Sequence, residues 1–319
     1  MKRPLSLKKG DTIGIVAPAR KITLREIRKA ILIIKNRGFQ VIYHDDLFAA
    51  RDQYAGNDDD RAVYFQKMLD DDRVKAIFAA RGGYGSVRII DKLDFSRFEE
   101  NPKWIVGYSD ITVFHNHINR NFGIETLHAT MPVNFAGNTD EALNGLFDVL
   151  NGNFPDYSLT NHPLNRQGSS NGILTGGNLS VLYSLCGSLS FPETENKILF
   201  LEDLDEYLYH VDRMMTALKR AGVLKNLAGL IVGGMTRMND NEIPFGKTAE
   251  EIIREAVDEY DYPVCFGFPA GHIFDNRPLI MGAEVEMKVP GKTYRRSSAA
   301  AKTETENKMT VFNQVNIKF

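Results

Sequence analysis

The first hundred residues alternate between short apolar runs and amphipathic stretches, and this alternation constrains the fold more than any other feature. Residues 12–17 are nearly continuously apolar and precede Pro18, which is typical of a strand buried on both faces. Residues 24–36 carry apolar side chains every three or four positions, so they predict a helix that ends at Gly38. Strands that alternate with helices in this way predict a parallel, doubly wound sheet.

The same pattern continues and then changes in the second half of the chain. Residues 39–43, 74–80 and 104–106 predict further strands, with a helical stretch at 61–69. Residues 161–172 consist largely of turn formers, so we expect a linker between an N-terminal domain (1–160) and a C-terminal domain (173–319). The expected fold is therefore α/β, with a doubly wound parallel sheet in the first domain and a mixed β/α arrangement in the second.

The second domain is less regular than the first. Residues 197–201 and 229–233 predict strands on either side of a helix at 211–221. From Glu284 onward, apolar residues at every second position predict antiparallel strands, which a polar loop at 295–308 would join.

Charge and cysteine content exclude several classes of protein. The 319 residues contain 39 Lys and Arg against 41 Asp and Glu, so the chain lacks the basic excess that nucleic acids or anionic membranes select. No segment has the pattern of a signal peptide or the length of apolar sequence of a transmembrane span, and we expect a cytoplasmic protein. The two cysteines, Cys186 and Cys265, lie in apolar stretches and are expected to be buried thiols without metal or redox chemistry.

Two turns that follow predicted strands are candidates for chemistry. Arg-Gly-Gly-Tyr-Gly at 81–85 is compatible with either a tight turn or a backbone cradle for an oxyanion, although it lacks the dinucleotide and Walker fingerprints. Gly-Tyr-Ser-Asp at 107–110 leads from a strand into a helix-compatible run. Ser109 in this context is either an exposed nucleophile on a sharp turn or simply a helix cap.

Two further segments lie in the second half of the chain. Leu-Glu-Asp-Leu-Asp-Glu at 201–206 places four carboxylates at the end of an apolar strand, where open α/β sheets bind their ligands. His272 lies on a Gly-rich, apolar segment at 266–272 and is the histidine best suited to a fixed position. The pair His115 and His117 is spaced by two residues, so the two do not share a helix face as metal ligands would.

Together these segments resemble the LD-carboxypeptidase family of serine peptidases, which includes muramoyltetrapeptide carboxypeptidase and the microcin C7 self-immunity protein. The resemblance covers most of the chain and rests on six motifs in the family's order. These are Gly-Asp-Thr-Ile-Gly-Ile-Val-Ala-Pro (10–18), Arg-Gly-Gly-Tyr-Gly (81–85), Gly-Tyr-Ser-Asp (107–110), Gly-Gly-Asn-Leu (176–179), Leu-Glu-Asp (201–203) with Asp-Arg-Met (212–214), and Gly-His (271–272).

The resemblance implies a catalytic triad assembled across the domain interface. Ser109 would be the nucleophile, His272 the base and Glu202 the residue that orients the histidine, which agrees with the roles such residue types play in acyl transfer. The backbone N–H of Asp110, with that of Gly82 or Gly83, would form the oxyanion hole. The implied reaction is cleavage of the L,D-peptide bond before the terminal D-Ala of a tetrapeptide muropeptide, in cytoplasmic cell-wall recycling and without a metal or other cofactor.

A carboxypeptidase must bind a free terminal carboxylate, and guanidinium groups do this through paired hydrogen bonds. Arg81 and Arg213 are the candidates, and the sequence does not decide between them. Family resemblance also allows a homodimer. Two other functions stay open: a hydrolase of peptidyl-adenylate analogues, for which a stacking aromatic near the site is expected, and a small-molecule binding protein in which Ser109 only caps a helix.

Overall fold

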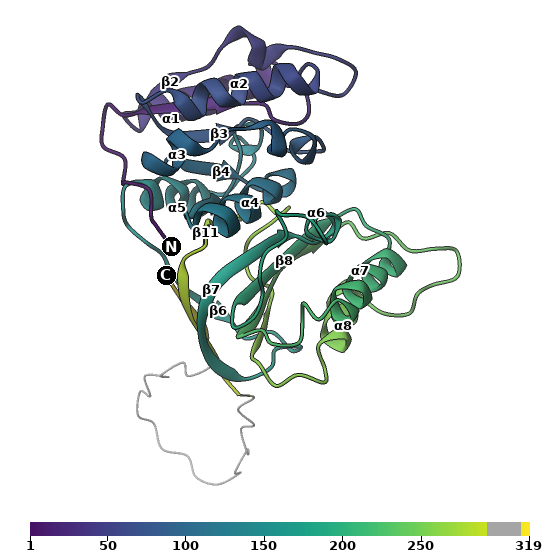
Figure 1. The fold of residues 1–319 in the computed structure, drawn as a ribbon. Helices are drawn as coiled ribbons and strands as arrows, with labels where there is room; N and C mark the ends of the chain where they lie inside the picture. Colours follow the sequence, from purple (N-terminus) through teal and green to yellow (C-terminus); the bar gives the residue numbers. More distant parts are fainter. Residues whose placement is uncertain (292–313) are drawn as a thin grey trace, which may run out of the picture.

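The computed structural model describes residues 1–291 and 314–319, which form two β-sheets with helices packed against them (Figure 1). The first half of the chain contains β1 (Thr12–Val16), α1 (Leu24–Asn36), β2 (Gln40–Ile42), α2 (Asp58–Asp70), β3 (Val74–Ala79), α3 (Ser96–Glu100), β4 (Trp104–Gly107), α4 (Thr112–Phe122), β5 (Thr126–His128) and α5 (Asp140–Leu150). The alternation of strands and helices predicted from the sequence is confirmed.

The second half contains β6 (Asp156–Thr160), β7 (Gly168–Asn178), α6 (Leu179–Ser184), β8 (Ile198–Leu204), α7 (Leu208–Arg220), β9 (Gly229–Thr236), α8 (Ala249–Ala256), β10 (Val264–Phe266), β11 (Leu279–Met281), β12 (Glu284–Val289) and β13 (Gln314–Lys318). The expected antiparallel strands of the tail are β12 and β13, which pair with each other. The polar loop predicted at 295–308 lies outside the described residues.

The six-stranded sheet has the order β11-β5-β4-β3-β1-β2, and all its pairs are parallel except β11 with β5. Because the chain passes from β2 to the opposite side of β1, right-handed crossovers place α1 on one face of the sheet and α2 on the other. Helices on the same face contact each other: Phe65 of α2 stacks on Phe114 of α4 with ring centroids 4.5 Å apart. The doubly wound parallel arrangement is confirmed.

The seven-stranded sheet is mixed, with the order β10-β9-β8-β7-β12-β13-β6. The first four strands are parallel and are connected through α6, α7 and α8, and the last three pair antiparallel. Leu-, Met- and Val-rich side chains of α7 and β8 form one core on its helical side. The mixed β/α character predicted for the second domain is also confirmed.

The boundaries between the two domains differ from the predicted ones. The predicted linker 161–172 overlaps β7, which begins at Gly168, and the second sheet already includes β6 at 156–160. Residues 168–172 of β7 are Gly, Ser and Asn, so their pairing with β12, rather than an apolar pattern, makes them a strand. In addition, β11 lies within the predicted second domain but completes the first sheet.

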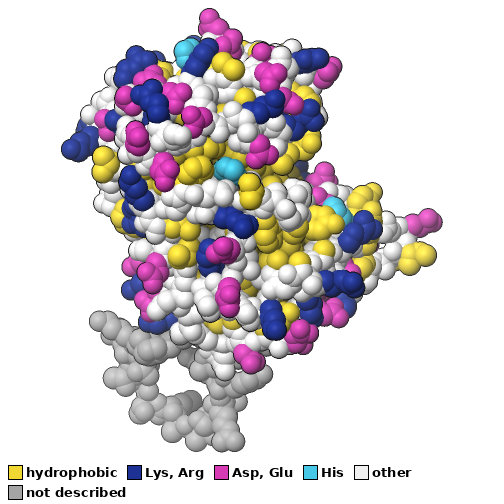
Figure 2. Space-filling model, in the orientation of Figure 1, with side chains coloured by type: hydrophobic (Ala, Val, Ile, Leu, Met, Phe, Trp, Pro, Cys, Tyr) yellow, Lys and Arg dark blue, Asp and Glu magenta, His cyan; other side chains and the backbone are white. Residues whose placement is uncertain are grey.

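The cysteines and the surface charge can be compared directly with the expectations. Cys265 is buried, as expected, but Cys186 is exposed, because it follows the end of α6 in a turn that leaves its side chain outside the core. On the face shown in Figure 2, acidic and basic side chains are interspersed over both domains, in keeping with the net charge of −2. Within the described ranges no helix combines the length and apolar character needed to cross a bilayer.

Candidate active site

The candidate site lies at the carboxyl ends of the strands in the six-stranded sheet, where its strand order reverses. Arg20 follows β1, Arg81 and the glycine loop follow β3, and Ser109 follows β4 by two residues. In open α/β sheets this switch point leaves a crevice because successive connections leave toward opposite faces. The topology therefore brings three separate loops to one place.

Ser109 occupies a strained turn between β4 and α4. Its φ is +64°, a left-handed conformation that costs a residue with a Cβ atom about 1–2 kcal/mol. The turn is a single 3₁₀ segment, Ser109–Ile111, that leads directly into α4. Gly107 permits this sharp turn, since a Cβ atom there would lie 2.7 Å from Ile111 Cγ1. A strained strand-to-helix turn of this kind presents a serine hydroxyl outward, as a nucleophile requires.

The glycine loop passes directly over Ser109. A Cβ atom on Gly82 would lie 3.2 Å from Ser109 Oγ, so a side chain at this position would crowd the serine. Gly83 has a φ of +112°, and a Cβ atom there would collide with the Arg20 side chain at 2.5 Å. Neither glycine N–H donates to another described residue. These amide groups are therefore available to an oxyanion beside Ser109.

Two buried side chains hold the end of the glycine loop in place. The Asp110 carboxylate accepts a 2.8 Å hydrogen bond from the Ser86 N–H. The Arg61 guanidinium donates to the Gly85 carbonyl at 3.1 Å and also to the Pro18 carbonyl. Burial raises the pKa of Asp110, although the Ser86 hydrogen bonds and the charge of Arg61 act in the opposite direction.

Glu202 belongs to the other domain and lies where β8 departs from regular pairing. The register between β8 and β9 shifts between Leu201 and Asp203, and irregularities of this type commonly redirect side chains near active sites. Glu202 has no exposed surface. On the neighbouring strand β9, Gly233 allows the backbone of Ala270 to pack closely against the strand. A Cβ atom on Gly233 would lie 2.5 Å from the Ala270 carbonyl oxygen.

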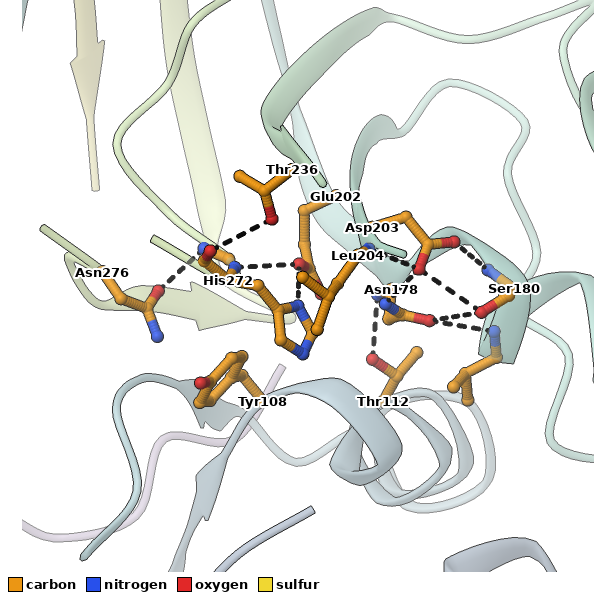
Figure 3. Close-up of polar contacts among 12 residues, drawn as sticks. Tyr108, Thr112, Asn178, Ser180, Glu202, Asp203, Leu204, Thr236, His272 and Asn276 are labelled. Atoms are coloured by element: carbon orange, nitrogen blue, oxygen red, sulfur yellow. Dashed lines mark hydrogen bonds and ion pairs between the residues drawn. The ribbon is translucent and has the colours of Figure 1, made fainter. Parts of the chain in front are cut away.

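His272 is held by Glu202 through two hydrogen bonds to the same oxygen (Figure 3). The His272 Nδ1 atom lies 2.7 Å from Glu202 Oε2, and the His272 backbone N–H donates to that atom at 3.2 Å. Gly271 has a φ of +107°, and a Cβ atom there would lie 2.6 Å from Glu202 Oε2. Only glycine therefore allows this contact.

The Glu202 and His272 pair stabilises the charged form of each partner. Burial by itself would raise the pKa of Glu202, but attraction to His272 and the hydrogen bond outweigh it, and the pKa is lowered. Burial would likewise lower the pKa of His272, but the Glu202 carboxylate reverses the shift, and the pKa is raised above its ordinary value of 6.5. A carboxylate that fixes the imidazole tautomer and stabilises the imidazolium is what a catalytic histidine needs.

Asp203, the next residue, points to the other side of β8 and organises the start of α6 (Figure 3). It accepts hydrogen bonds from Asn178 Nδ2 at 2.9 Å and from the Ser180 N–H at 2.8 Å. Burial and the neighbouring Glu202 raise its pKa to about 7, against the effect of these hydrogen bonds. The two adjacent carboxyl groups thus have different surroundings, and their pKa values are shifted in opposite directions.

Ser109 and His272 line one open pocket of about 390 Å³ between the domains. Gly82 and Gly83 line the same pocket, and the Tyr108 ring packs against the His272 ring with centroids 4.8 Å apart. Ser109 and His272 do not form a hydrogen bond in this structure, and such catalytic hydrogen bonds often tighten only around bound substrate. The structure thus brings Ser109, His272, Glu202 and the glycine loop together.

The structure separates the two arginines that the sequence suggested for carboxylate binding. Arg81 lines the pocket, donates to the Lys21 carbonyl at 3.1 Å and forms an ion pair with Glu26 at 3.4 Å. Arg213 is exposed on α7, lies over the Tyr209 ring and is not among the pocket residues. Arg20, which lines the pocket beside Gly83, was not predicted from the sequence. Its position shortly after the first predicted strand, where parallel sheets bind their ligands, could have identified it as a site residue.

Other buried histidines have structural surroundings. His115 Nε2 lies 2.9 Å from the Gly107 carbonyl oxygen and its Nδ1 2.9 Å from Thr126 Oγ1. Burial lowers the pKa of His115 to about 3 and that of His128 to about 4, so both are neutral. In residues 1–291 and 314–319, no cluster of three or more His, Cys, Asp or Glu side chains is arranged to hold a metal ion.

Comparison with known proteins finds two matching family models. Residues 13–129 match the LD-carboxypeptidase N-terminal domain and residues 171–287 the LD-carboxypeptidase C-terminal domain. The chain is 33% identical over 301 residues to a probable murein peptide carboxypeptidase of Bacillus subtilis, covering 91% of this chain and 93% of the relative. It is 26% identical over 286 residues to the murein tetrapeptide carboxypeptidase of Pseudomonas aeruginosa, covering 83% of this chain and 89% of that protein.

Solved structures share the fold. The crystal structure of muramoyltetrapeptide carboxypeptidase from Oxalobacter formigenes aligns with a TM-score of 0.82 at 24% identity, over 96% of this chain and 98% of that one. The microcin C7 self immunity protein MccF aligns with a TM-score of 0.80 at 23% identity, over 88% of this chain and 94% of that one.

Proposed function

The chain belongs to the LD-carboxypeptidase family, and from this premise we propose that it removes the terminal D-alanine from murein tetrapeptides. As a member of the family it is a serine-type carboxypeptidase. The proposed substrate is L-Ala-γ-D-Glu-meso-diaminopimelate-D-Ala, and the bond cleaved is the L,D-peptide bond before D-Ala. The names of the relatives from Bacillus subtilis and Pseudomonas aeruginosa support this class of substrate.

One observation carries the mechanistic part of the proposal. A histidine held at 2.7 Å by a fully buried glutamate shares a pocket with a serine in a strained turn. The glycine loop comes so close to this serine that a Cβ atom on Gly82 would lie 3.2 Å from the serine hydroxyl oxygen. A binding protein gains nothing from strain and a buried carboxylate at this point, whereas acyl transfer uses a nucleophile, a base, an orienting acid and oxyanion donors together.

In the proposed acylation step, Ser109 Oγ attacks the carbonyl carbon of the diaminopimelate residue while His272 Nε2 takes the hydroxyl proton. The backbone N–H groups of Asp110 and of Gly82 or Gly83 bind the oxyanion that forms. Glu202 stays ionised, keeps the His272 Nδ1 proton in place and stabilises the imidazolium. Loss of one oxyanion donor in such a site typically raises the barrier by about 3–4 kcal/mol.

The tetrahedral intermediate then collapses as the C–N bond breaks and the imidazolium gives its proton to the leaving amine of D-Ala. An ester between Ser109 and the tripeptide remains. A water molecule attacks this ester, His272 accepts one of its protons, and Ser109 regains its own proton when the tripeptide carboxylate leaves. No further cofactor is required to balance these steps.

The leaving residue is a free amino acid with a carboxylate, and Arg20 and Arg81 are the cations on that wall of the pocket. We assign them to the terminal carboxylate, since a guanidinium binds this group through two parallel hydrogen bonds. This assignment gives the enzyme its preference for chain ends over internal bonds. Arg213 is left out of it because it does not line the pocket.

The first test is incubation of the tetrapeptide with wild type, Ser109→Ala and Ser184→Ala, followed by mass spectrometry. Ser184 is an exposed serine on α6 and serves as the matched control. Release of one alanine by wild type and Ser184→Ala, but not by Ser109→Ala, is the expected result. If wild type releases none but a fluorophosphonate still labels Ser109, the substrate assignment is wrong; if the probe does not react either, the chain is a binding protein.

A second candidate, hydrolysis of peptidyl-adenylate analogues, is supported by the shared fold with the microcin C7 self immunity protein. In that reaction the nucleotide would leave, so it would lie beside Arg20 and Arg81. Among the described residues, Tyr108 is the only Phe, Trp or Tyr that lines this pocket, and it is buried. The murein substrate is therefore preferred, and an aminoacyl sulfamoyl adenosine added to the same assay compares the two.

Cytoplasmic recycling of wall peptides and a homodimer are also part of the proposal, because both follow from the resemblance to the family. Cell fractionation and light scattering of the purified protein check these two points separately from the reaction. Recovery of the protein in a compartment outside the cytoplasm would overturn the first, and a monomer at working concentration the second.

A further inference from the structure

The catalytic pocket continues past His272 into a second half that the proposed chemistry does not use. This second half has a volume of about 470 Å³, and five residues, Tyr108, Val133, Asn134, Leu204 and His272, line both halves. It is bordered further out by Thr236 at the end of β9, by Arg237 after it, and by Ile273 and Phe274 after His272. One groove therefore runs between the domains with His272 near its middle.

The two halves differ in charge. The half that contains Ser109 is lined by two cations, Arg20 and Arg81, and by two acids, Asp203 and Asp205. Among the described residues that line the second half, Arg237 is the only Lys, Arg, Asp or Glu. Arg237 is exposed and forms no ion pair with any residue of the described ranges. The second half therefore suits a ligand group that carries a negative charge alone.

Phe274 gives the second half an exposed apolar wall, and its backbone is anchored by hydrogen bonds. Its side chain is 77% exposed. Its carbonyl oxygen accepts hydrogen bonds from the Thr139 N–H at 3.1 Å and from Asn138 Nδ2 at 2.8 Å. Asp275 beside it accepts a 2.8 Å hydrogen bond from Thr139 Oγ1. The backbone that carries the exposed ring is thus held in place before any ligand arrives, which lowers the entropic cost of binding.

We propose that this second half, the Arg237 subsite, binds the acyl portion of the substrate, with Arg237 on the free α-carboxylate of the γ-linked D-glutamyl residue. The inference rests on the proposed function. The amine of that residue is acylated, so its α-carboxylate stands without a neighbouring ammonium group. The distal end of meso-diaminopimelate carries an ammonium group and a carboxylate. It therefore matches the half of the groove that contains Ser109, whose lining has both basic and acidic side chains. Phe274 covers the methylene groups of the glutamyl chain.

The test compares the tetrapeptide with a substrate in which the glutamyl α-carboxylate is an amide, D-isoglutamine. For wild type the amide should raise KM about tenfold, the effect expected when one charged hydrogen bond is lost. For Arg237→Gln, KM should be about tenfold higher for the acid and equal for the two substrates, with kcat changed less than about twofold. Arg220→Gln, an exposed arginine on α7, is the matched control and should behave like wild type.

Each outcome decides a separate point. If wild type cleaves neither substrate, the proposed function is wrong. If wild type cleaves both and Arg237→Gln keeps the preference for the acid, the subsite assignment is wrong. If Arg237→Gln instead loses its preference for diaminopimelate over lysine in the third position, Arg237 binds the distal carboxylate and the proposal is overturned. A Phe274→Ala variant, with a higher KM for both substrates but an unchanged preference between them, would support the apolar wall.

Discussion

Asp110 accepts a 2.8 Å hydrogen bond from the Ser86 backbone N–H, so the residue that follows Ser109 also anchors the glycine loop that covers it. Asp110 is 2% exposed, and Ser86 is fully buried. The position of the backbone donors over Ser109 is therefore coupled to the position of Ser109 itself. A displacement of the turn moves the loop with it.

We expect Asp110→Ala to lower both stability and kcat, because it leaves the Ser86 N–H buried without an acceptor. The expected loss in the free energy of unfolding is about 1–3 kcal/mol, measured by urea denaturation. Asp110→Asn keeps an acceptor oxygen and should recover much of the loss. Asp148→Ala, an exposed change on α5, is the control. Full kcat in a folded Asp110→Ala protein would contradict the coupling.

Glu202→Gln should change the pH profile as well as the rate. Because Glu202 raises the pKa of His272, and only neutral imidazole accepts the Ser109 proton, wild-type kcat/KM should fall as pH drops through a value above 6.5. Without the carboxylate charge this acid limb moves to lower pH. The maximal rate falls by on the order of 10⁴-fold, because an amide no longer secures the correct tautomer. An unchanged acid limb would show that His272 is not the titrating base.

Gly271→Ala should separate backbone strain from a collision with Glu202. The new Cβ atom would lie 2.6 Å from Glu202 Oε2, in a backbone with a φ of +107°. Gly246→Ala has a similar φ of +85° but open space around it. Both variants should lose about 1–2 kcal/mol in thermal or urea unfolding. Only Gly271→Ala should also lose kcat, by on the order of 100-fold; equal kcat in the two variants would argue against the collision.

Arg20→Gln and Arg81→Gln should each weaken binding of substrates with a free terminal carboxylate. The expected rise in KM for the tetrapeptide is about tenfold, and KM for its C-terminal amide should stay nearly constant. Arg213→Gln should leave both values unchanged because Arg213 lies outside the pocket. If Arg213→Gln alone raised KM for the free acid, the alternative assignment made from the sequence would be correct.

The fold of the first domain was readable from the sequence because its strands and helices carry strong apolar periodicity, as in β1 and α1. Residues 126–128 and 156–160, which form β5 and β6, were not predicted as strands, since such short or partly polar segments are specified by their neighbours. Residues 279–281 pair with β5, which lies about 150 residues earlier in the chain. Local sequence patterns do not predict pairing between segments so far apart.

In the candidate site, the motifs named Ser109, Glu202 and His272, and the structure brings these three toward one pocket. The left-handed backbone of Ser109 and the close approach of Gly82 to Ser109 depend on three-dimensional packing. A sequence motif does not predict such packing. Arg20 was missed for the same reason: it lies far along the chain from the glycine loop, and only the sheet order makes them neighbours.

The edge strand β11 has a consequence for the biosynthesis of the protein. Five strands of the first sheet have been translated by residue 128, but the strand that covers the β5 edge lies at 279–281. During synthesis the nascent chain therefore carries an uncovered sheet edge for about half of its length. Nearly the entire polypeptide must leave the ribosome before the first domain is complete, and interrupted translation products would expose an edge that invites aggregation.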